Sequence, residues 1–299
     1  MRRKESGFTM VEILTVVGII AMLVAVLIPT LTMVRRIAKE TKQTAQLTAI
    51  DLALTAFKSD DGDYPPSGWN EPPDYKQDYC GSQKLAEALL GLDLLGFHQD
   101  SDWNADGYDD SGNDLYPDNL DPTNPTDLKN LNDRIGPYLD VAAANAFRLG
   151  ISEPGKRDGL FVDTTPLERN TFVICDIFSA KNITLSLPGT GGKTITLKAG
   201  APILYYRADT SKKTIHTVGT NDRIYNVYDN LPLIHLKRVD DQKEHPLMDS
   251  AGTYRFFYEE YIRDPKVTAM PWPYRPDSYI LISAGADGLY GTEDDIRNF

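Results

Sequence analysis

The first 34 residues of the chain are far more hydrophobic than the rest. After a short basic leader, MRRKESG, an apolar stretch runs to Val34 and holds one acidic residue, Glu12. From Ile13 to Val34 no side chain is charged, and these 22 residues form roughly 33 Å of helix at about 1.5 Å each. This length predicts a membrane-spanning helix. A carboxylate in hydrocarbon is costly, so we expect Glu12 to have a dedicated partner.

The helical pattern continues beyond the membrane segment in amphipathic form. From Val34 to Phe57, apolar residues recur near every third or fourth position, with charged and polar residues between them. The acidic and proline-rich run SDDGDYPPSG, residues 59–68, then stops the helix. We therefore predict one continuous helix from about Thr9 to Lys58, whose second half packs its apolar stripe against a globular domain.

The rest of the chain is predicted to hold loops, one more helix and several strands. Residues 69–140 are acidic and loop-rich, with a short helix expected over Ser82–Leu95. A glycine-rich run at residues 188–193 predicts a hairpin loop between two strands. The fold class is therefore α+β, a long helix packed on an antiparallel sheet with a large loop-rich insertion. Strands are predicted at Gly159–Val162, Thr171–Phe178, Ile183–Leu187, Thr194–Lys198, Pro202–Ala208, Thr214–Val218 and Ser278–Ser283.

A family resemblance lies at the end of the leader. The residues GFTMVE, positions 7–12, follow a basic leader and resemble the class III signal of type IV pilins and type II secretion pseudopilins. The helix exit AFKSDDGDYPPSG resembles that of the major pseudopilin. The resemblance covers about residues 1–68 and 277–299. It implies a pilin-like fold, cleavage after Gly7 by a prepilin peptidase, N-methylation of Phe8, and a role for Glu12 in filament assembly. Pro29 corresponds to the family's membrane-helix proline.

Physical chemistry gives these residues a plausible assembly role. Cleavage would free a positive amine on Phe8, and in a helix bundle the Glu12 carboxylate of one subunit could pair with that amine on its neighbour. Such a pair is tolerable in hydrocarbon and would fix the register between helices. Pro29 removes one backbone hydrogen bond and is expected to kink or locally melt the helix.

The expected organisation has four parts. Residues 1–7 form the leader, 8–34 the transmembrane helix, 35–58 its amphipathic continuation, and 59–299 the extracytoplasmic domain with calcium-binding loops. The basic leader favours a single pass through the inner membrane, with the N-terminus cytoplasmic and the C-terminal domain periplasmic. An uncleaved signal anchor is the alternative interpretation.

Composition narrows the class of partner. Removal of the leader moves the formal net charge from −12 to −14, so the exported domain is a poor candidate for binding nucleic acid and a good one for binding cations. The two cysteines, Cys80 and Cys175, could form a disulfide in an exported protein, and the sequence leaves this open.

One candidate calcium (Ca2+) site lies at residues 102–110, DWNADGYDD. Oxygen-bearing side chains at loop positions 1, 3, 5 and 9, with glycine at 6, match a calcium-loop pattern. Asn113 stands at position 12 in place of glutamate, which makes the loop more similar to dockerin or thrombospondin-type loops. A solvated acidic turn is the alternative. The predicted ligands are Asp102, Asn104, Asp106, the Tyr108 carbonyl and Asp110.

A second candidate lies at residues 283–296 and resembles the C-terminal calcium loop of the major pseudopilin. That resemblance implies side-chain ligands at Asp287, Asp294 and Asp295, and a backbone ligand at Leu289. Carboxylates held this close repel one another without a cation, so metal binding and loop order should be coupled. A frayed acidic tail is the alternative.

No arrangement of nucleophile and base stands out, so we do not expect an enzyme. The leading hypothesis is a structural subunit of a type II secretion pseudopilus that supports protein secretion. Its expected partners are its own copies, other pseudopilins, the prepilin peptidase, the inner-membrane assembly platform and membrane lipid, but not nucleic acid. The alternatives are a type IV pilus or minor pilin subunit, a membrane-anchored binding module that never polymerises, and, more weakly, an extracytoplasmic hydrolase.

Overall fold

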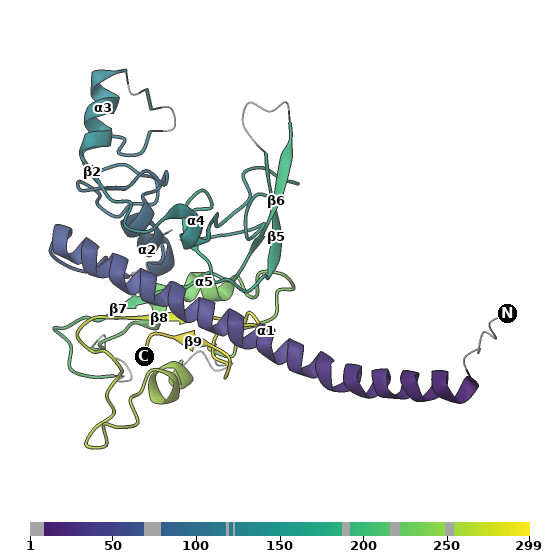
Figure 1. The fold of residues 1–299 in the computed structure, drawn as a ribbon. Coiled ribbons are helices and arrows are strands. Elements are labelled where there is room, and N and C mark those ends of the chain that lie inside the picture. The colour runs from purple at the N-terminus through teal and green to yellow at the C-terminus, as the bar shows by residue number, and fades with distance from the viewer. Residues whose placement is uncertain are drawn as a thin grey trace. The chain divides into compact units, whose positions relative to one another are not determined.

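The computed structural model describes residues 9–68, 79–117, 120–121, 123–186, 192–215, 222–248 and 254–299. The chain divides into two compact units, Met1–Lys42 and Gln43–Phe299. Helix α1 (Met10–Asp61) runs from the first unit into the second, and each part is described by itself (Figure 1). The predicted continuous helix is confirmed, ending at Asp61 rather than Lys58.

Within the first unit, α1 is long and apolar enough to cross a membrane. Its mean hydropathy reaches 2.8 over an 18-residue window, none of which is buried within the protein. The helix remains regular through Pro29, so the local melting considered for that proline does not occur. The Thr30 and Thr32 hydroxyls donate to the carbonyls of Val26 and Pro29, at 2.8 and 2.7 Å.

A three-stranded antiparallel sheet lies at the centre of the second unit. It has the order β7 (Leu204–Arg207), β8 (Tyr279–Ser283) and β9 (Ile296–Arg297). All five residues of β8 are buried, and alternate ones enter two separate hydrophobic clusters. Tyr279 and Leu281 belong to one cluster and Ile280 and Ile282 to the other. Because the strand is covered on both faces, its sequence is apolar without alternation.

The cluster on the Leu281 face is formed with α1 and with α2 (Gly81–Leu90). From α1 it takes an apolar stripe that includes Ile50, Leu54 and Phe57, all fully buried. Gln46 adds polar anchoring, since its side-chain amide donates to the carbonyls of Ala144 and Cys175 at 3.1 and 3.0 Å. The predicted packing of the second half of the helix against a globular domain is confirmed.

The remaining described elements are short and lie outside the central sheet (Figure 1). The predicted hairpin is confirmed, since β5 (Lys181–Ser186) pairs antiparallel with β6 (Thr194–Ala199) as a separate two-stranded sheet. Two further strand pairs join β1 (Phe97–His98) with β2 (Arg134–Ile135) and β3 (Ala146–Arg148) with β4 (Phe172–Ile174). The other elements are α3 (Pro125–Asn132), α4 (Val141–Ala144), a 3-10 turn (Val227–Asp229), α5 (Leu231–His235) and a π-helical turn (Phe257–Tyr261).

Several predicted boundaries were wrong. The helix expected over Ser82–Leu95 ends at Leu90, because Gly91 has a φ of +83° and its N–H donates to the Glu87 carbonyl at 2.7 Å. In place of the strand expected at Gly159–Val162, the structure has one isolated bridge between Gly150 and Phe161.

The strand expected at Thr171–Phe178 is confined to Phe172–Ile174. Asp176 ends it by accepting a hydrogen bond from the Phe178 N–H, which turns the chain. In the strand expected at Thr214–Val218, Thr214 and Ile215 are not extended in a sheet, and the later residues lie outside the described part.

Candidate assembly and calcium sites

Glu12 has a local partner at the start of α1. One of its carboxylate oxygens accepts hydrogen bonds from the Thr9 N–H and from the Thr9 hydroxyl, both at 2.8 Å. The Glu12 N–H in turn donates to the Thr9 hydroxyl at 3.3 Å. This is a reciprocal capping box, and the spacing T-x-x-E that encodes it is readable in the sequence, although our sequence analysis missed it. The predicted processing residues, Gly7 and Phe8, lie outside the described residues.

The predicted ligands of the C-terminal loop converge on one hydroxyl, that of Thr292. Its oxygen lies 2.6 Å from an Asp294 carboxylate oxygen, 3.2 Å from the Leu289 carbonyl and 3.5 Å from an Asp295 oxygen. The same hydroxyl stabilises the Asp287 carboxylate. Three predicted side-chain ligands and the predicted backbone ligand are therefore neighbours. Thr292 is the member of this group that the sequence analysis did not single out.

The carboxylates of this loop are held in different ways. The second oxygen of Asp294 accepts from the backbone N–H groups of Ala286 and Asp287, at 2.8 and 3.0 Å. Burial, together with the negative charge of Asp294, raises the pKa of Asp287. Asp295 accepts from the Gly291 N–H at 2.7 Å and from the Tyr261 hydroxyl, and burial raises its pKa to about 7.

The first loop, residues 102–110, is closed by hydrogen bonds from its own backbone. Asp102 accepts from the Asp110 N–H at 2.7 Å, and Asp106 accepts from the Tyr108 N–H at 3.0 Å. The Asn104 amide donates to the Tyr108 carbonyl at 3.3 Å. Gly107 supplies a positive φ of +76°, as the pattern requires. The five predicted ligands thus belong to one compact turn.

Asn113, at loop position 12, does not face these ligands. Its N–H and its side-chain amide both donate to Asp109 at 2.7 Å, and this side-chain bond leads the causes that lower the pKa of Asp109. Among the described residues, no three or more His, Cys, Asp or Glu side chains form a group arranged to hold a metal ion. Any calcium site would therefore need carbonyl, amide or hydroxyl oxygens as well, and both loops place such groups beside their carboxylates.

A buried carboxylate attaches the first loop to the protein core. Glu87 on α2 is 1 % exposed and accepts hydrogen bonds from three hydroxyls. Tyr79 and Ser101 each donate at 2.6 Å, and Tyr116 donates at 3.1 Å. Because Ser101 and Tyr116 lie on either side of the loop in the chain, Glu87 holds both of its ends. Burial raises the pKa of Glu87.

The C-terminal loop has a comparable buried anchor. Asp176 is fully buried and accepts from the N–H groups of Phe178 and Ala201, at 3.0 and 3.1 Å. Ser283, the last residue of β8, donates its hydroxyl to Asp176 at 3.1 Å, just before the loop begins. Burial raises the pKa of Asp176 to about 8.

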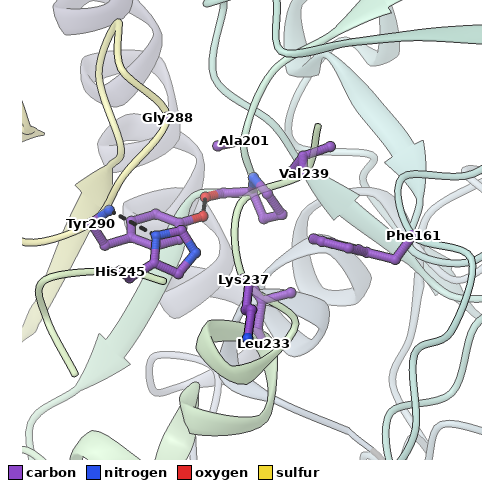
Figure 2. Close-up of a pocket in the computed structure, with 9 residues that line it drawn as sticks. Phe161, Ala201, Leu233, Lys237, Val239, His245, Gly288 and Tyr290 are labelled. Carbon is purple, nitrogen blue, oxygen red and sulfur yellow. Dashed lines mark hydrogen bonds between the residues drawn. The ribbon is translucent and has the colours of Figure 1, made fainter. Parts of the chain in front are cut away.

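Figure 2 shows a small hollow beside the C-terminal loop, lined by residues that include His245, Leu233 and Tyr290. The Tyr290 N–H donates to Nδ1 of His245 at 3.2 Å, and its hydroxyl donates to the Pro202 carbonyl. Burial lowers the pKa of His245 to about 4, so the imidazole is neutral near pH 7 and Nδ1 can accept. The hollow is too small for a water molecule, so it is packing rather than a ligand site.

Both cysteines are free thiols in the structure. Cys80 and Cys175 are fully buried in the same hydrophobic cluster, and burial raises the pKa of each thiol. The disulfide that the sequence left open is therefore not formed. Buried, protonated thiols of this kind are chemically inert.

The long apolar helix, its acidic N-terminal turn and the small antiparallel sheets together give the chain an α+β layout like that of the type IV pilins. Comparison with known proteins agrees: the family described as the prokaryotic N-terminal methylation motif matches residues 2–28. Over 107 residues the chain is 34 % identical to type II secretion system core protein G of Pseudomonas aeruginosa. The predicted resemblance to a type II secretion pseudopilin is confirmed.

The match to core protein G covers 36 % of this chain and 64 % of the relative, so the chain spans less than two thirds of that protein's length. No solved structure matches the chain.

Proposed function

We propose that this protein is a structural subunit of a type II secretion pseudopilus, without enzymatic activity. The observation that carries the proposal is the methylation motif on an exposed apolar helix that carries Glu12 in its first turn. Exposed apolar side chains along residues 10–34 need lipid or other helices to cover them. Copies of the same helix would provide such a cover. The proposed partners are other copies, further pseudopilins, the prepilin peptidase and the inner-membrane assembly platform.

Processing would prepare the helix for assembly. In this proposal the peptidase cuts after Gly7 and Phe8 becomes the methylated N-terminus. The Glu12 carboxylate would then exchange its neutral donors on Thr9 for the charged amine of a neighbouring subunit. The amine would neutralise the charge of the carboxylate, which its donors on Thr9 do not do, and this favours the exchange in a medium without water.

We also propose that calcium stabilises the exported domain at two loops. Asp287, Asp294, Asp295 and the Leu289 carbonyl would hold one ion, and the convergence of these groups on Thr292 supports that assignment. Asp102, Asn104, Asp106, Asp110 and the Tyr108 carbonyl would hold the other. Oxygen ligands on a tight turn are those that calcium prefers. When bound, calcium would offset the mutual repulsion of the carboxylates.

Replacing Glu12 tests the assembly mechanism. We expect Glu12→Leu to abolish filaments while the protein still enters the membrane, because the charged partner of the neighbouring amine is lost. Thr15→Leu is a matched control, since it makes the same helix more apolar without removing a carboxylate. The measurement is electron microscopy of filaments after co-expression with the peptidase and assembly machinery.

Mass spectrometry of the same material tests processing, with methylated Phe8 as the expected N-terminus. Intact filaments from Glu12→Leu would overturn the pairing mechanism, and retention of Met1 would overturn the processing step. If wild-type protein is found only as solitary molecules in the native envelope, a membrane-anchored binding module becomes the better interpretation.

A further inference from the structure

The middle region of the chain, residues 69–276, supplies contacts that hold the C-terminal loop. The Leu247 N–H donates to the Tyr290 carbonyl within that loop at 3.0 Å. Tyr261 makes a contact of a different kind, because its hydroxyl donates to Asp295, one of the predicted calcium ligands. The family resemblance does not extend to the middle region, so this contact has to be understood from the structure itself.

Tyr261 is held in place through both its backbone and its ring. It is 6 % exposed and ends the π-helical turn, which is closed by a hydrogen bond from the Ile262 N–H to the Phe257 carbonyl at 3.0 Å. Turns of this kind occur frequently at functional sites. Arg297 on β9 donates to the Tyr261 carbonyl at 3.1 Å, and its guanidinium carbon lies 4.8 Å from the centre of the tyrosine ring. The hydroxyl therefore meets Asp295 at a fixed place.

The two carboxylate oxygens of Asp295 have different surroundings. Oδ2 accepts hydrogen bonds from the Tyr261 hydroxyl and from the Gly291 N–H, the latter at 2.7 Å. Oδ1 lies 3.5 Å from the Thr292 hydroxyl, around which the other predicted ligands are gathered. Because two donors hold Oδ2, the carboxylate keeps Oδ1 directed toward that group. Hydrogen bonds from outer residues orient ligating carboxylates in this way at metal sites.

We propose that Tyr261 is a positioning residue for the C-terminal calcium site. Its hydroxyl holds one oxygen of Asp295 so that the other is presented to the ion. Because this orientation exists before the ion arrives, less conformational freedom is lost on binding and the affinity is higher. This role rests on the proposed calcium binding at the loop, and it gives part of the middle region a function in that site.

Tyr258 offers a matched control within the same turn. It is fully buried, and its hydroxyl accepts hydrogen bonds from the Val227 N–H at 3.0 Å and from the Arg223 guanidinium at 3.1 Å. Both of these partners lie outside the C-terminal loop. Tyr261→Phe and Tyr258→Phe therefore each remove one buried, hydrogen-bonded hydroxyl, and both should lower stability without calcium by similar amounts.

Calcium titration calorimetry of the full-length protein in micelles tests the role. Both variants are made in a background of Asp102→Asn with Asp106→Asn, so that the C-terminal loop alone binds calcium. We expect Tyr261→Phe to raise the calcium Kd about tenfold, as loss of a residue that orients a metal ligand does, and Tyr258→Phe to leave it unchanged. In excess EDTA the melting temperatures of the two variants should fall to a similar extent.

The tyrosine absorption spectrum gives a second measurement, taken at saturating calcium. When Asp295 binds calcium, the phenol that is hydrogen-bonded to it should change its near-ultraviolet absorption. The absorption change that calcium produces should therefore be smaller in Tyr261→Phe than in the background protein, and unaltered in Tyr258→Phe. Equal changes in all three proteins would contradict the contact between the Tyr261 hydroxyl and a calcium ligand.

The outcomes separate this role from the proposed calcium site. A background protein that binds no calcium would show that the C-terminal site is wrong, and the role of Tyr261 would fail with it. Calcium binding that is equally tight with and without Tyr261→Phe would overturn the positioning role alone and leave the site intact. Equal weakening by Tyr261→Phe and Tyr258→Phe would also overturn it, because the effect would then come from the stability of the turn.

Discussion

Buried carboxylates organise much of the polar structure of the second unit. Glu87 gathers three hydroxyls around α2 and thereby fixes both ends of the first loop. Asp176 joins the segment after β4 to the end of β8, where the C-terminal loop begins. Burying a polar group costs free energy unless it is hydrogen-bonded, so each of these carboxylates imposes a specific arrangement on its donors. Loop position is thus determined by single residues in the core.

Asp176 should make stability depend on pH. Burial raises its pKa from 3.8 to about 8, so the folded chain keeps a proton that the unfolded chain releases. The contribution of this proton to the free energy of unfolding is complete below about pH 4 and is lost as the pH rises to about 8. The loss is no steeper than about 1.4 kcal/mol per pH unit. We expect the free energy of unfolding of the wild type to fall relative to that of Asp176→Asn between pH 5 and pH 8.

Denaturant unfolding in detergent micelles with excess chelator measures this difference. The amide of Asp176→Asn can accept from the same two N–H groups and donate to Ser283, so the fold should persist. Asp209→Asn, at an exposed turn, is the control and should follow the wild type at each pH. A constant difference between Asp176→Asn and wild type across this range would contradict the raised pKa.

At the scale of elements, α1 has two environments along one continuous helix. Its first part exposes apolar side chains on all sides, whereas its second part buries one stripe and exposes the other. Phe57 is the last buried residue of that stripe, and its ring centroid lies 5.1 Å from that of Phe97 and 5.7 Å from that of Tyr138. The stripe joins the helix to the core, so its loss should affect the whole unit.

Truncating Phe57 tests this packing. We expect Phe57→Ala to lower the free energy of unfolding by about 3–5 kcal/mol, because the side chain is fully buried and leaves a cavity. Leu52→Ala, on the same helix at a residue that is 69 % exposed, should change it by less than about 0.5 kcal/mol. Unfolding monitored by circular dichroism in micelles compares the two variants. Equal losses of unfolding free energy in the two variants would show that the buried stripe does not hold the helix to the core.

The sequence predicts long elements better than short ones. The helix over residues 10–61 and the β5–β6 hairpin follow from repeated hydrophobic patterns and from turn residues that lie within each segment. The two-residue strands β1 and β2 have no such pattern, because their pairing depends on contacts between Phe97 and Ile135, distant in the chain. Helix α2 ends early because Gly91 adopts a positive φ, which no periodicity reveals.

The same difference between local patterns and distant contacts decides which parts of the candidate sites can be predicted from the sequence. The family resemblance implied Asp287, Leu289, Asp294 and Asp295 as ligands, and the structure places them around Thr292, because they are close in sequence. The roles of Glu87, Asp176 and His245 depend on the folded core, and a lone buried acid or histidine has no sequence pattern. Thr9 is different: its capping box with Glu12 is local and could have been predicted.

For the whole molecule, the two proposed calcium loops should act on a single folded unit. Both are anchored to the core through buried carboxylates, so binding at either loop should stabilise the domain as a whole. A ligand at about one hundred times its Kd adds about 2.7 kcal/mol per site. We therefore expect excess EDTA to lower the melting temperature of the full-length protein in micelles by several degrees, and added calcium to restore it.

Paired variants separate the two sites. Asp287→Asn with Asp294→Asn should remove one calcium ion per chain in titration calorimetry, and Asp102→Asn with Asp106→Asn should remove the other. Each double variant should show a smaller change of melting temperature in EDTA than the wild type, because only one loop still binds calcium. Glu153→Gln with Glu259→Gln removes two surface charges outside both loops and should behave as wild type. A wild-type melting curve that does not move in EDTA would count against both sites, and a response lost with one pair alone would leave a single calcium ion stabilising the domain.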